Sequence, residues 1–382
     1  MSAVRVVITT AVKSRLSKRS EPDLALGGGP DLNKPLIIAL DVMGGDKAPD
    51  VVLQGAGIAL QRFPQVAFLL YGAEDRIAPL LAKLPAVAAA STIIHTVDMI
   101  TGDAKPSAAL RTGKQSSMRL AIDAVADGRA HCVVSAGNTG ALMAMAKIVL
   151  KTLPGISRPA IASFLPTMRG ETVLLDLGAN IECDADNLVQ FALMGDAFAR
   201  TVLGVVKPTI GLLNVGSEEL KGVEAVREAA SRLRSLPTVS FSGFVEGDDI
   251  CGGAVDVIVT DGFTGNVALK TAEGAVKLYA SFLRSALQSS MLARLGYLFA
   301  MPALNKLRRR VDPRRYNGAM LLGLNGIVVK SHGGSDALAF ANAIGVAADL
   351  VINGFLEKMR GELAALHQPS IDPAATPTPA TA

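Results

Sequence analysis

Short apolar runs that alternate with helical patterns are the feature that most constrains the fold of this chain. Leu36–Asp41, His131–Ser135 and Thr209–Leu213 are nearly continuous apolar runs, a pattern typical of strands covered on both faces. Amphipathic stretches typical of helices, such as Gln115–Asp127 and Gly265–Leu283, lie between many of these runs. The alternation predicts a two-lobed α/β fold with a mostly parallel sheet and helices on both faces.

Length and composition agree with a large buried core. The chain has 382 residues, half of them apolar, which is enough for two lobes. A further helix is expected at Leu188–Leu203. The remaining strands are expected at Val66–Gly72, Thr92–Val97, Ala160–Leu165, Thr172–Asp176, Val239–Val245, Val255–Thr260, Met320–Leu324 and Ile327–Lys330. Tryptophan is absent and aromatic residues make up 4%, which argues against nucleic acid as a partner.

The two ends of the chain differ from its middle. Residues 1–34 hold a short apolar run followed by basic residues, the wrong order for a secretory signal. We expect this segment to be a disordered or weakly anchoring extension. Residues 367–382 are rich in Pro, Ala and Thr, and we expect a disordered tail. Residues 35–366 then form the main domain.

Cysteine usage and hydropathy indicate the compartment. Cys132, Cys183 and Cys251 are an odd, scattered set, which suggests reduced thiols in a cytoplasmic protein. No apolar run approaches the roughly 18 residues needed to span a bilayer. We therefore expect a cytoplasmic protein, with peripheral contact to the inner face of the cell membrane as a further option.

Several kinds of enzyme are excluded by missing motifs. GxxxxGK[ST], G-x-G-x-x-G after the first strand and G-x-S-x-G are all absent, which argues against a P-loop, a standard dinucleotide fold and a nucleophile elbow. The four histidines lack metal-ligand spacing. The acidic group Glu182, Asp184 and Asp186 is better explained by acids at a helix start than by Mg²⁺. The carboxylates beside Cys183 disfavour a thiolate nucleophile. No metal is expected.

In the stretch IIALDVMGGDKAPDVV, a glycine turn comes directly after the first apolar run. Gly44 and Gly45 allow a turn that side chains would block, and Pro49 suits the first turn of a helix. Asp46 and Lys47 place one charge of each sign there. This arrangement fits a generic anion site, and it fits an ordinary strand-to-helix connection equally well.

Four other strand ends carry the same mixture of glycine, Asn or Asp, and hydroxyl residues. They are SAGNTGA from Ser135, DLGAN from Asp176, NVGSEELKG from Asn214 and DGFTGN from Asp261. Any one alone is more simply a capped helix start. Because strand ends in α/β folds gather ligand-binding residues, we expect the set to converge on one crevice rich in hydrogen-bond donors. Such a crevice suits a phosphate and an oxyanion.

The chemistry left open is direct displacement without a covalent intermediate. Inorganic phosphate is already an anionic nucleophile, so it needs orientation more than activation, and an acyl carbonyl needs an oxyanion hole. Lys47 and Lys270 are candidate phosphate ligands, and Lys270 follows Asn266 by four residues on one helix face. His332 lies among glycines in KSHGGSD. For each lysine, a solvated helix face is an equally good explanation.

Together the motifs DVMGGDKAP, KPSAALRTGKQSSM, SAGNTGALMA, LDLGAN, LNVGSEELKG, DVIVTDGFTGNVALK and YNGAMLLGLNGIVVKSHG resemble the bacterial phosphate acyltransferases of the PlsX family. The resemblance runs from about residue 36 to 356. It implies a fold similar to isopropylmalate dehydrogenases and phosphotransacetylases, and a homodimer. It also implies reversible conversion of fatty acyl-ACP (acyl carrier protein) and inorganic phosphate to acyl phosphate and ACP. The acyl phosphate would pass to a membrane glycerol-3-phosphate acyltransferase in phospholipid synthesis.

The resemblance makes residues 35–366 the catalytic domain and needs no resident cofactor, because phosphopantetheine arrives on ACP. Catalytic candidates are Asp46, Lys47, Asn138, Asn180, Asn214, Asp261, Asn266 and Lys270. Candidate phosphate- or acyl-binding residues are Gly44, Gly45, Ser135, Thr139, Asp176, Gly262, Thr264, Gly265 and His332. Two other functions fit the residues. One is a phosphotransacetylase acting on acyl-CoA, and the other is a non-enzymatic ACP-binding scaffold at a membrane surface.

A basic, amphipathic helical segment at about residues 283–315 is the last candidate. Residues 277–316 hold nine Lys or Arg and one Asp. Pro302 should end the first helix of the segment. The side chains expected to meet a membrane or ACP are Leu287, Met291, Leu295, Leu298, Phe299, Arg308, Arg309 and Arg310. An apolar face with a basic rim can lie on an anionic bilayer, pack on its own core or in a dimer, or dock acidic ACP.

Overall fold

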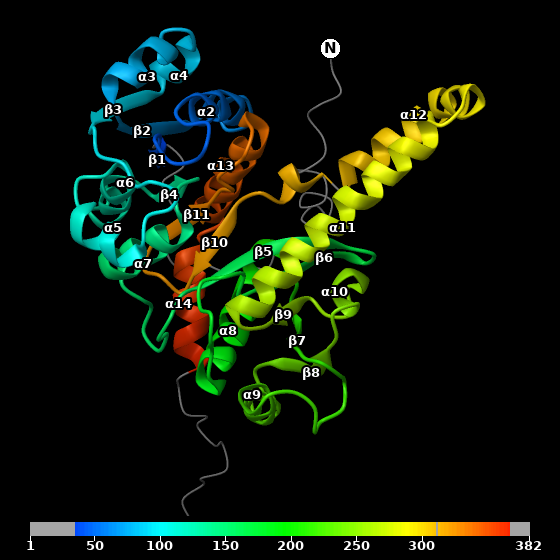
Figure 1. Ribbon diagram of the computed structural model, residues 1–382. Helices are drawn as coiled ribbons and strands as arrows, with labels where there is room; N and C mark the ends of the chain where they lie inside the picture. Colours follow the sequence, from blue (N-terminus) through cyan, green and yellow to red (C-terminus); the bar gives the residue numbers. More distant parts are fainter. Residues whose placement is uncertain (1–34, 311, 367–382) are drawn as a thin grey trace, which may run out of the picture.

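The computed structural model describes residues 35–310 and 312–366, so the predictions for residues 1–34 and 367–382 lie outside the described part (Figure 1). An 11-stranded sheet forms the centre. Its strands are β1 (Leu36–Asp41), β2 (Val66–Gly72), β3 (Ser91–His95), β4 (Cys132–Ser135), β5 (Ala160–Thr167), β6 (Gly170–Leu175), β7 (Thr209–Leu213), β8 (Ser240–Val245), β9 (Val257–Val259), β10 (Ala319–Leu322) and β11 (Ile327–Lys330). Every predicted strand is present, with shifts of a few residues at the ends.

The strand order β3-β2-β1-β4-β11-β10-β5-β6-β9-β7-β8 divides the sheet into two parallel blocks. Strands β1, β2, β3, β4 and β11 run parallel in what we call the first lobe. Strands β6, β7, β8 and β9 run parallel in the second lobe. Between the blocks, β10 and β5 pair antiparallel with each other and with their outer neighbours. The two blocks therefore run in opposite directions.

The described residues form helices that cover both faces of this sheet and a pair, α11 and α12, that projects from it. They are α2 (Asp50–Arg62), α3 (Glu74–Leu81), α4 (Pro85–Ala89), α5 (Pro106–Thr112), α6 (Ser117–Ala126), α7 (Thr139–Leu150), α8 (Ala185–Phe198), α9 (Glu224–Arg234), α10 (Asp249–Gly252), α11 (Gly262–Gln288), α12 (Met291–Arg310), α13 (Ala337–Ile352) and α14 (Phe355–Leu366). A π-helical turn follows α8 at Ala199–Leu203, and a 3₁₀ turn at Pro313–Tyr316 precedes β10.

Alternate residues of the same strands fill two hydrophobic cores. Ile38 of β1 and Val134 of β4 belong to one core, with α2, α8 and α13. Ala39 and Val133, their neighbours in sequence, belong to the other core, with α6 and α7. Because successive strand residues point to opposite faces, strands covered on both sides must be apolar throughout. This confirms the prediction made from the continuous apolar runs.

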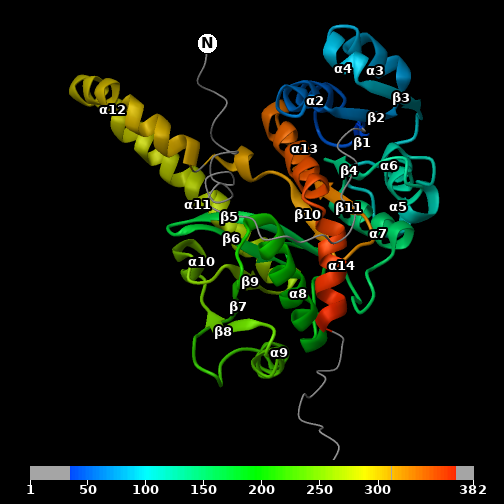
Figure 2. The same cartoon turned by 180° about the vertical axis from the view of Figure 1, so that it is seen from behind.

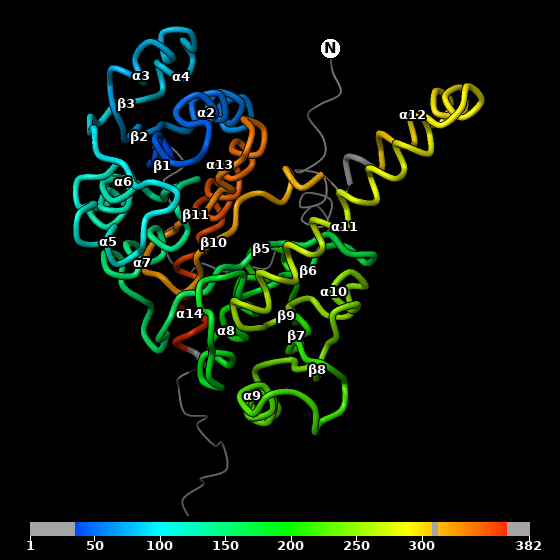
Figure 3. Tube along the Cα trace, in the orientation of Figure 1, coloured from blue at the N-terminus to red at the C-terminus, as the bar shows by residue number. Residues whose placement is uncertain are grey.

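Helices α11 and α12 form a hairpin that projects from the body in both views (Figures 1 and 2). The chain trace in Figure 3 leaves the second lobe along α11 and returns along α12. The prediction that Pro302 ends a helix is wrong, because α12 continues through it. The break instead falls between Gln288 and Met291, so the predicted amphipathic segment is divided between two helices. No single described helix is long and apolar enough to cross a membrane; α13 with the first part of α14 passes that test only as a pair bent by 57°.

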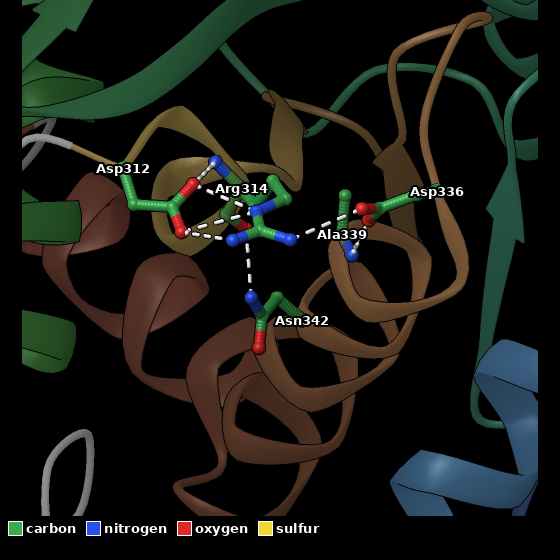
Figure 4. A network of polar contacts seen from close by, with 5 residues as sticks. All are labelled: Asp312, Arg314, Asp336, Ala339 and Asn342. Carbon is green, nitrogen blue, oxygen red and sulfur yellow. Dashed lines mark hydrogen bonds and ion pairs between the residues drawn. The ribbon is translucent and has the colours of Figure 1, made fainter. Parts of the chain in front are cut away.

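The end of the hairpin is tied to the first lobe by Arg314 (Figure 4). Its guanidinium contacts the carboxylates of Asp312, at 2.6 Å, and Asp336, at 3.2 Å. Asn342 donates to the Arg314 carbonyl at 2.7 Å, and Asp336 caps α13 by accepting from the N–H of Ala339. The hydrogen bonds that Arg314 donates to both carboxylates raise its pKa. The turn after the hairpin is thereby held on the start of α13.

Candidate functional site

Three neighbouring strands of the first lobe end in polar residues at the same level. Asp41 of β1 and Lys330 of β11 both pair with Ser135 of β4 in the register of the sheet. All three side chains are buried. The residues two positions earlier in each strand lie in the core formed with α6 and α7, so the three share that face of the sheet. We call these residues and Ser117 the first cluster.

Two hydroxyl groups hold the carboxylate of the first cluster. Ser117, at the start of α6, donates to Asp41 Oδ1, and Ser135 donates to Asp41 Oδ2, both at 2.6 Å. Burial raises the pKa of Asp41, while these two hydrogen bonds oppose that shift. The Ser135 oxygen also accepts from the N–H of Gly137 at 3.0 Å. The single Ser135 proton is therefore used inside the protein, and its hydroxyl oxygen organises this loop.

The glycine turn after β1 lies against the loops after β4 and β11. A Cβ on Gly44 would approach the Gly137 nitrogen to 2.8 Å, and one on Gly45 would approach the Gly333 carbonyl to 3.2 Å. The Asp46 N–H donates to that carbonyl at 3.0 Å. Helix α2 begins at Asp50 with Pro49 at its N-cap, within one residue of the predicted start, and a turn over residues 46–49 precedes it. Lys47 is exposed in this turn and is not at a helix start.

Asn138 caps α7, which is the role expected if its motif is a capped helix start. Its Oδ1 accepts from the N–H of Ala141 at 2.8 Å. Its Nδ2 donates to the carbonyls of Gly102 and Ala104, which holds the loop before α5. Thr139 is exposed at the first position of the helix. The amide of Asn138 thus fixes two loops of the first lobe.

A second cluster forms in the second lobe around Asp176, after β6. The buried carboxylate accepts from the backbone N–H groups of Ile161, Ala179 and Asn180. It also accepts from Asn180 Nδ2 at 2.9 Å. Burial raises the pKa of Asp176, and the hydrogen bonds counteract the shift. With four N–H partners, this carboxylate is satisfied by the protein itself.

The start of α11 packs on this loop and completes the second cluster. Asp261 caps the helix, accepting from the Thr264 N–H at 2.8 Å and from its hydroxyl at 2.7 Å. The Gly262 N–H donates to the Asn180 carbonyl at 2.7 Å. A Cβ on Gly265 would lie 1.9 Å from the Asp176 carbonyl oxygen. These contacts fill most of the backbone donors that an anion would use at this helix start.

The other predicted residues lie farther from these hydrogen bonds. Asn266 faces the Gly178 backbone, and Lys270 is exposed along α11. Asn214 donates to the carbonyls of Gly216 and Lys221, so it shapes its own loop. His332 is exposed, and its Nδ1 accepts from the Gly334 N–H at 3.1 Å.

Two of the acidic residues and two of the cysteines have surroundings that agree with the sequence-based expectations. Asp184 caps α8 by accepting from the Asn187 N–H at 2.8 Å, and Asp186 pairs with Arg232. Burial raises the pKa of Cys132. Burial, with Asp176 and Asp261 nearby, raises the pKa of Cys183 to about 12. Neither thiol is set up to ionise near neutral pH.

The predicted residues divide between the two lobes, and the parallel strands of one lobe run opposite to those of the other. The hydrogen bonds described above stay within each cluster. A hollow of about 460 Å³ adjoins the second cluster, lined by Ile181, Glu182, Cys183, Asp261, Phe263 and Thr264. A groove of about 410 Å³ lies between α11 and α12, and Leu287 is among its lining residues.

The predicted contact residues of the hairpin are largely exposed. Met291, Leu295, Leu298 and Phe299 leave half or more of their surface accessible. Leu287 lines the groove between the helices. Arg308, Arg309 and Arg310 lie at the end of α12, and their side chains fall outside the described part of the structure.

Sequence reasoning missed Asp41, Ser117 and Lys330 as site residues. Asp41 and Lys330 are the charged last residues of otherwise apolar strands. A charge that closes an apolar strand is a usable signal, because burying it is costly without a partner.

Two solved structures with a similar fold are a phosphotransacetylase and a phosphotransacylase. A phosphotransacetylase from Streptococcus pyogenes aligns with a TM-score of 0.57 and 21% identity, covering 84% of this chain and 95% of that one. A branched-chain phosphotransacylase from Enterococcus faecalis aligns with a TM-score of 0.54 and 15% identity, covering 83% and 99%. These likenesses define the class of fold, a two-lobed α/β architecture of the phosphotransacetylase type.

Sequence relatives identify the family within that class. A family model described as "Fatty acid synthesis protein" matches residues 36–358. The phosphate acyltransferase of Rhodospirillum centenum is 68% identical over 337 residues, which is 88% of this chain and 95% of the relative. That of Rhodospirillum rubrum is 61% identical, covering 87% and 96%. The chain therefore belongs to the phosphate acyltransferase family.

Proposed function

We propose that this protein transfers a fatty acyl group from acyl-ACP to inorganic phosphate, giving acyl phosphate and free ACP. The observation that carries the proposal is the 68% identity to a phosphate acyltransferase over nearly its whole length. Phosphate is one substrate by that name. The acyl-ACP donor and the onward use of acyl phosphate for glycerol-3-phosphate acylation follow from the motif resemblance.

The chemistry proposed is direct displacement at the thioester. A phosphate oxygen attacks the acyl carbonyl carbon, the new C–O bond forms, and the C–S bond breaks to release the phosphopantetheine thiolate of ACP. The raised pKa of the Cys132 and Cys183 thiols disfavours an acyl-cysteine intermediate. The protein then contributes mainly orientation of phosphate and polarisation of the carbonyl.

A comparison of donors tests this function. The purified protein is given labelled phosphate with long-chain acyl-ACP, long-chain acyl-CoA or acetyl-CoA, and acyl phosphate is trapped as the hydroxamate. We expect the highest kcat/KM with acyl-ACP. A preference for acetyl-CoA would favour a phosphotransacetylase instead. Binding of ACP without acyl phosphate from any donor would favour a scaffold.

We further propose that the α11–α12 hairpin contacts an anionic membrane surface at the inner face of the cell membrane, where a membrane acyltransferase takes the product. At its tip, Met291 and Leu292 are 87% and 80% exposed. Apolar tip residues with basic residues along α12 suit such a surface. A Met291→Ser/Leu292→Ser variant should float less with anionic vesicles and keep its activity on acyl-ACP. Equal flotation of variant and wild type would contradict membrane contact.

A homodimer interface is another role expected for this hairpin. Tyr279 and Phe282 of α11 are each 65% exposed, and the apolar groove between the helices lies beside them. Packing against a second copy would cover this surface. The mass of the wild type in solution, measured by light scattering, distinguishes a dimer from a monomer.

A further inference from the structure

Lys330 carries a buried charge for which the protein supplies few partners. The side chain is 9% exposed. An ammonium group has three N–H donors, and one of them goes to the carbonyl of Ser331, the next residue in the chain. Within the described residues, no carboxylate lies within 4.0 Å of it and no second acceptor hydrogen bonds to it. Burying a charge in this way is costly unless an anion compensates it.

The carboxylates of Asp41 and Asp46 attract the charge of Lys330 without contacting it. Asp41 and Asp46 both favour the charged form of Lys330, while burial lowers its pKa to about 8. The Asp41 oxygens are already held by Ser117 and Ser135. Asp46 is exposed beside the Gly333 and Gly334 backbone. Both acids therefore hold a positive charge in place and leave its remaining N–H groups free.

The surroundings of Lys330 suit a small oxyanion. The bond to the Ser331 carbonyl keeps the ammonium at the carboxyl end of β11, level with the ends of β1 and β4. Ligands of α/β sheets bind at that edge. The loops there are built on Gly44, Gly45 and Gly333, where the backbones pack closely. Ser331, which follows the lysine, is fixed by hydrogen bonds to Asn317 and Ser335.

We propose that Lys330 is the main cation of a phosphate-binding site at the ends of β1, β4 and β11. Asp41 is a positioning residue, because it acts by holding Ser135, Ser117 and the charge of Lys330. The inference rests on the proposed function and adds to it the residue that binds the phosphate group. That group is inorganic phosphate, the nucleophile, or the phosphodiester of phosphopantetheine on ACP.

The test replaces Lys330 with methionine, which removes the charge and keeps a similar length. Lys147→Met, an exposed lysine of α7, is the control for net charge. For Lys330→Met, we expect the KM for phosphate to rise about 10- to 100-fold, the effect of losing a charge-assisted hydrogen bond, with the KM for acyl-ACP unchanged. A rise in the acyl-ACP KM alone would support the same anion site with the phosphodiester as its ligand. Unchanged values for both substrates would overturn the proposal.

A binding measurement separates this inference from the proposed reaction. Inorganic phosphate should raise the melting temperature of the wild type and of Lys147→Met, but not that of Lys330→Met. This result would stand even if no donor yielded acyl phosphate, in which case the proposed function alone fails. Equal phosphate shifts in all three proteins would contradict the site.

If Lys330→Met does not fold, crystals of the wild type grown with phosphate decide the question. A phosphate oxygen within hydrogen-bond distance of Lys330 Nζ supports the proposal. Phosphate bound at the second cluster and away from Lys330 overturns it.

Discussion

The first and second clusters carry the same sequence signature but satisfy their charges in different ways. In the second cluster, Asp176 accepts from four N–H groups, and the Asp261 carboxylate occupies the start of α11. In the first cluster, Lys330 keeps donors that have no partner among the described residues. A charge that the fold satisfies supports structure, and one that the fold leaves open is available for a ligand.

The largest expected loss of stability comes from removing the Asp176 carboxylate, whose charge the protein satisfies. Asp176→Ala removes the acceptor of three backbone N–H groups, one buried and two part-buried. Each buried group left unsatisfied costs roughly 1 to 3 kcal/mol. We expect the free energy of unfolding in urea to fall by about 4 kcal/mol. Asp176→Asn, which keeps one oxygen acceptor, should lose about half as much. An Ala variant as stable as the wild type would mean that the second cluster is not a structural support.

A close approach in the second cluster predicts the next effect. The Cβ of Gly265→Ala would lie 1.9 Å from the Asp176 carbonyl oxygen, whereas one on Gly274, in the same helix, has no atom within 4 Å. We expect Gly265→Ala to cost about 3 kcal/mol through overpacking. Gly274→Ala should stabilise by about 1 kcal/mol, because alanine favours helix. Thermal unfolding of both variants measures the difference, and equal effects would contradict the contact.

Asp196 adds a third case to the comparison, because this buried carboxylate forms an ion pair with Arg200. It lies 2.7 Å from Arg200, yet burial raises its pKa to about 6 from 3.8. Because the folded state holds this proton more tightly, the contribution of Asp196 to stability is greatest below pH 4 and is lost as the pH rises through 6. The shift corresponds to about 2 to 3 kcal/mol. Unfolding of Asp196→Asn between pH 4 and 7 should lack this slope, and an unchanged slope would contradict the assignment.

The smallest expected change in stability concerns Lys330 in the first cluster. Lys330→Met removes a buried charge that has no ion-pair partner within residues 35–310 and 312–366. We therefore expect the variant to be more stable by about 1 kcal/mol and to bind phosphate more weakly. Lys147→Met should change the free energy of unfolding by less than about 0.5 kcal/mol. A strongly destabilised Lys330→Met variant would indicate that the lysine supports the fold.

Much of the fold could be predicted because both faces of the sheet are covered. Continuous apolar runs such as Val257–Val259 leave few other structures for those residues. The glycine-rich strand ends could also be located from the sequence. Their role could not, because helix capping and ligand binding require the same residue types. Asn138 and Asp261 proved to be caps, and a single sequence could not separate the two roles. Lys330 was missed because its meaning depends on burial and on distances to other strands.

The hairpin has a mechanical consequence. Helix α11 begins on the Asp176 loop of the second lobe, and the chain leaving α12 is fixed by Arg314 to the start of α13. With 27 residues in α11, its arm is about 40 Å long. A force applied at the tip is therefore delivered through a long lever to two anchor points, one on each lobe.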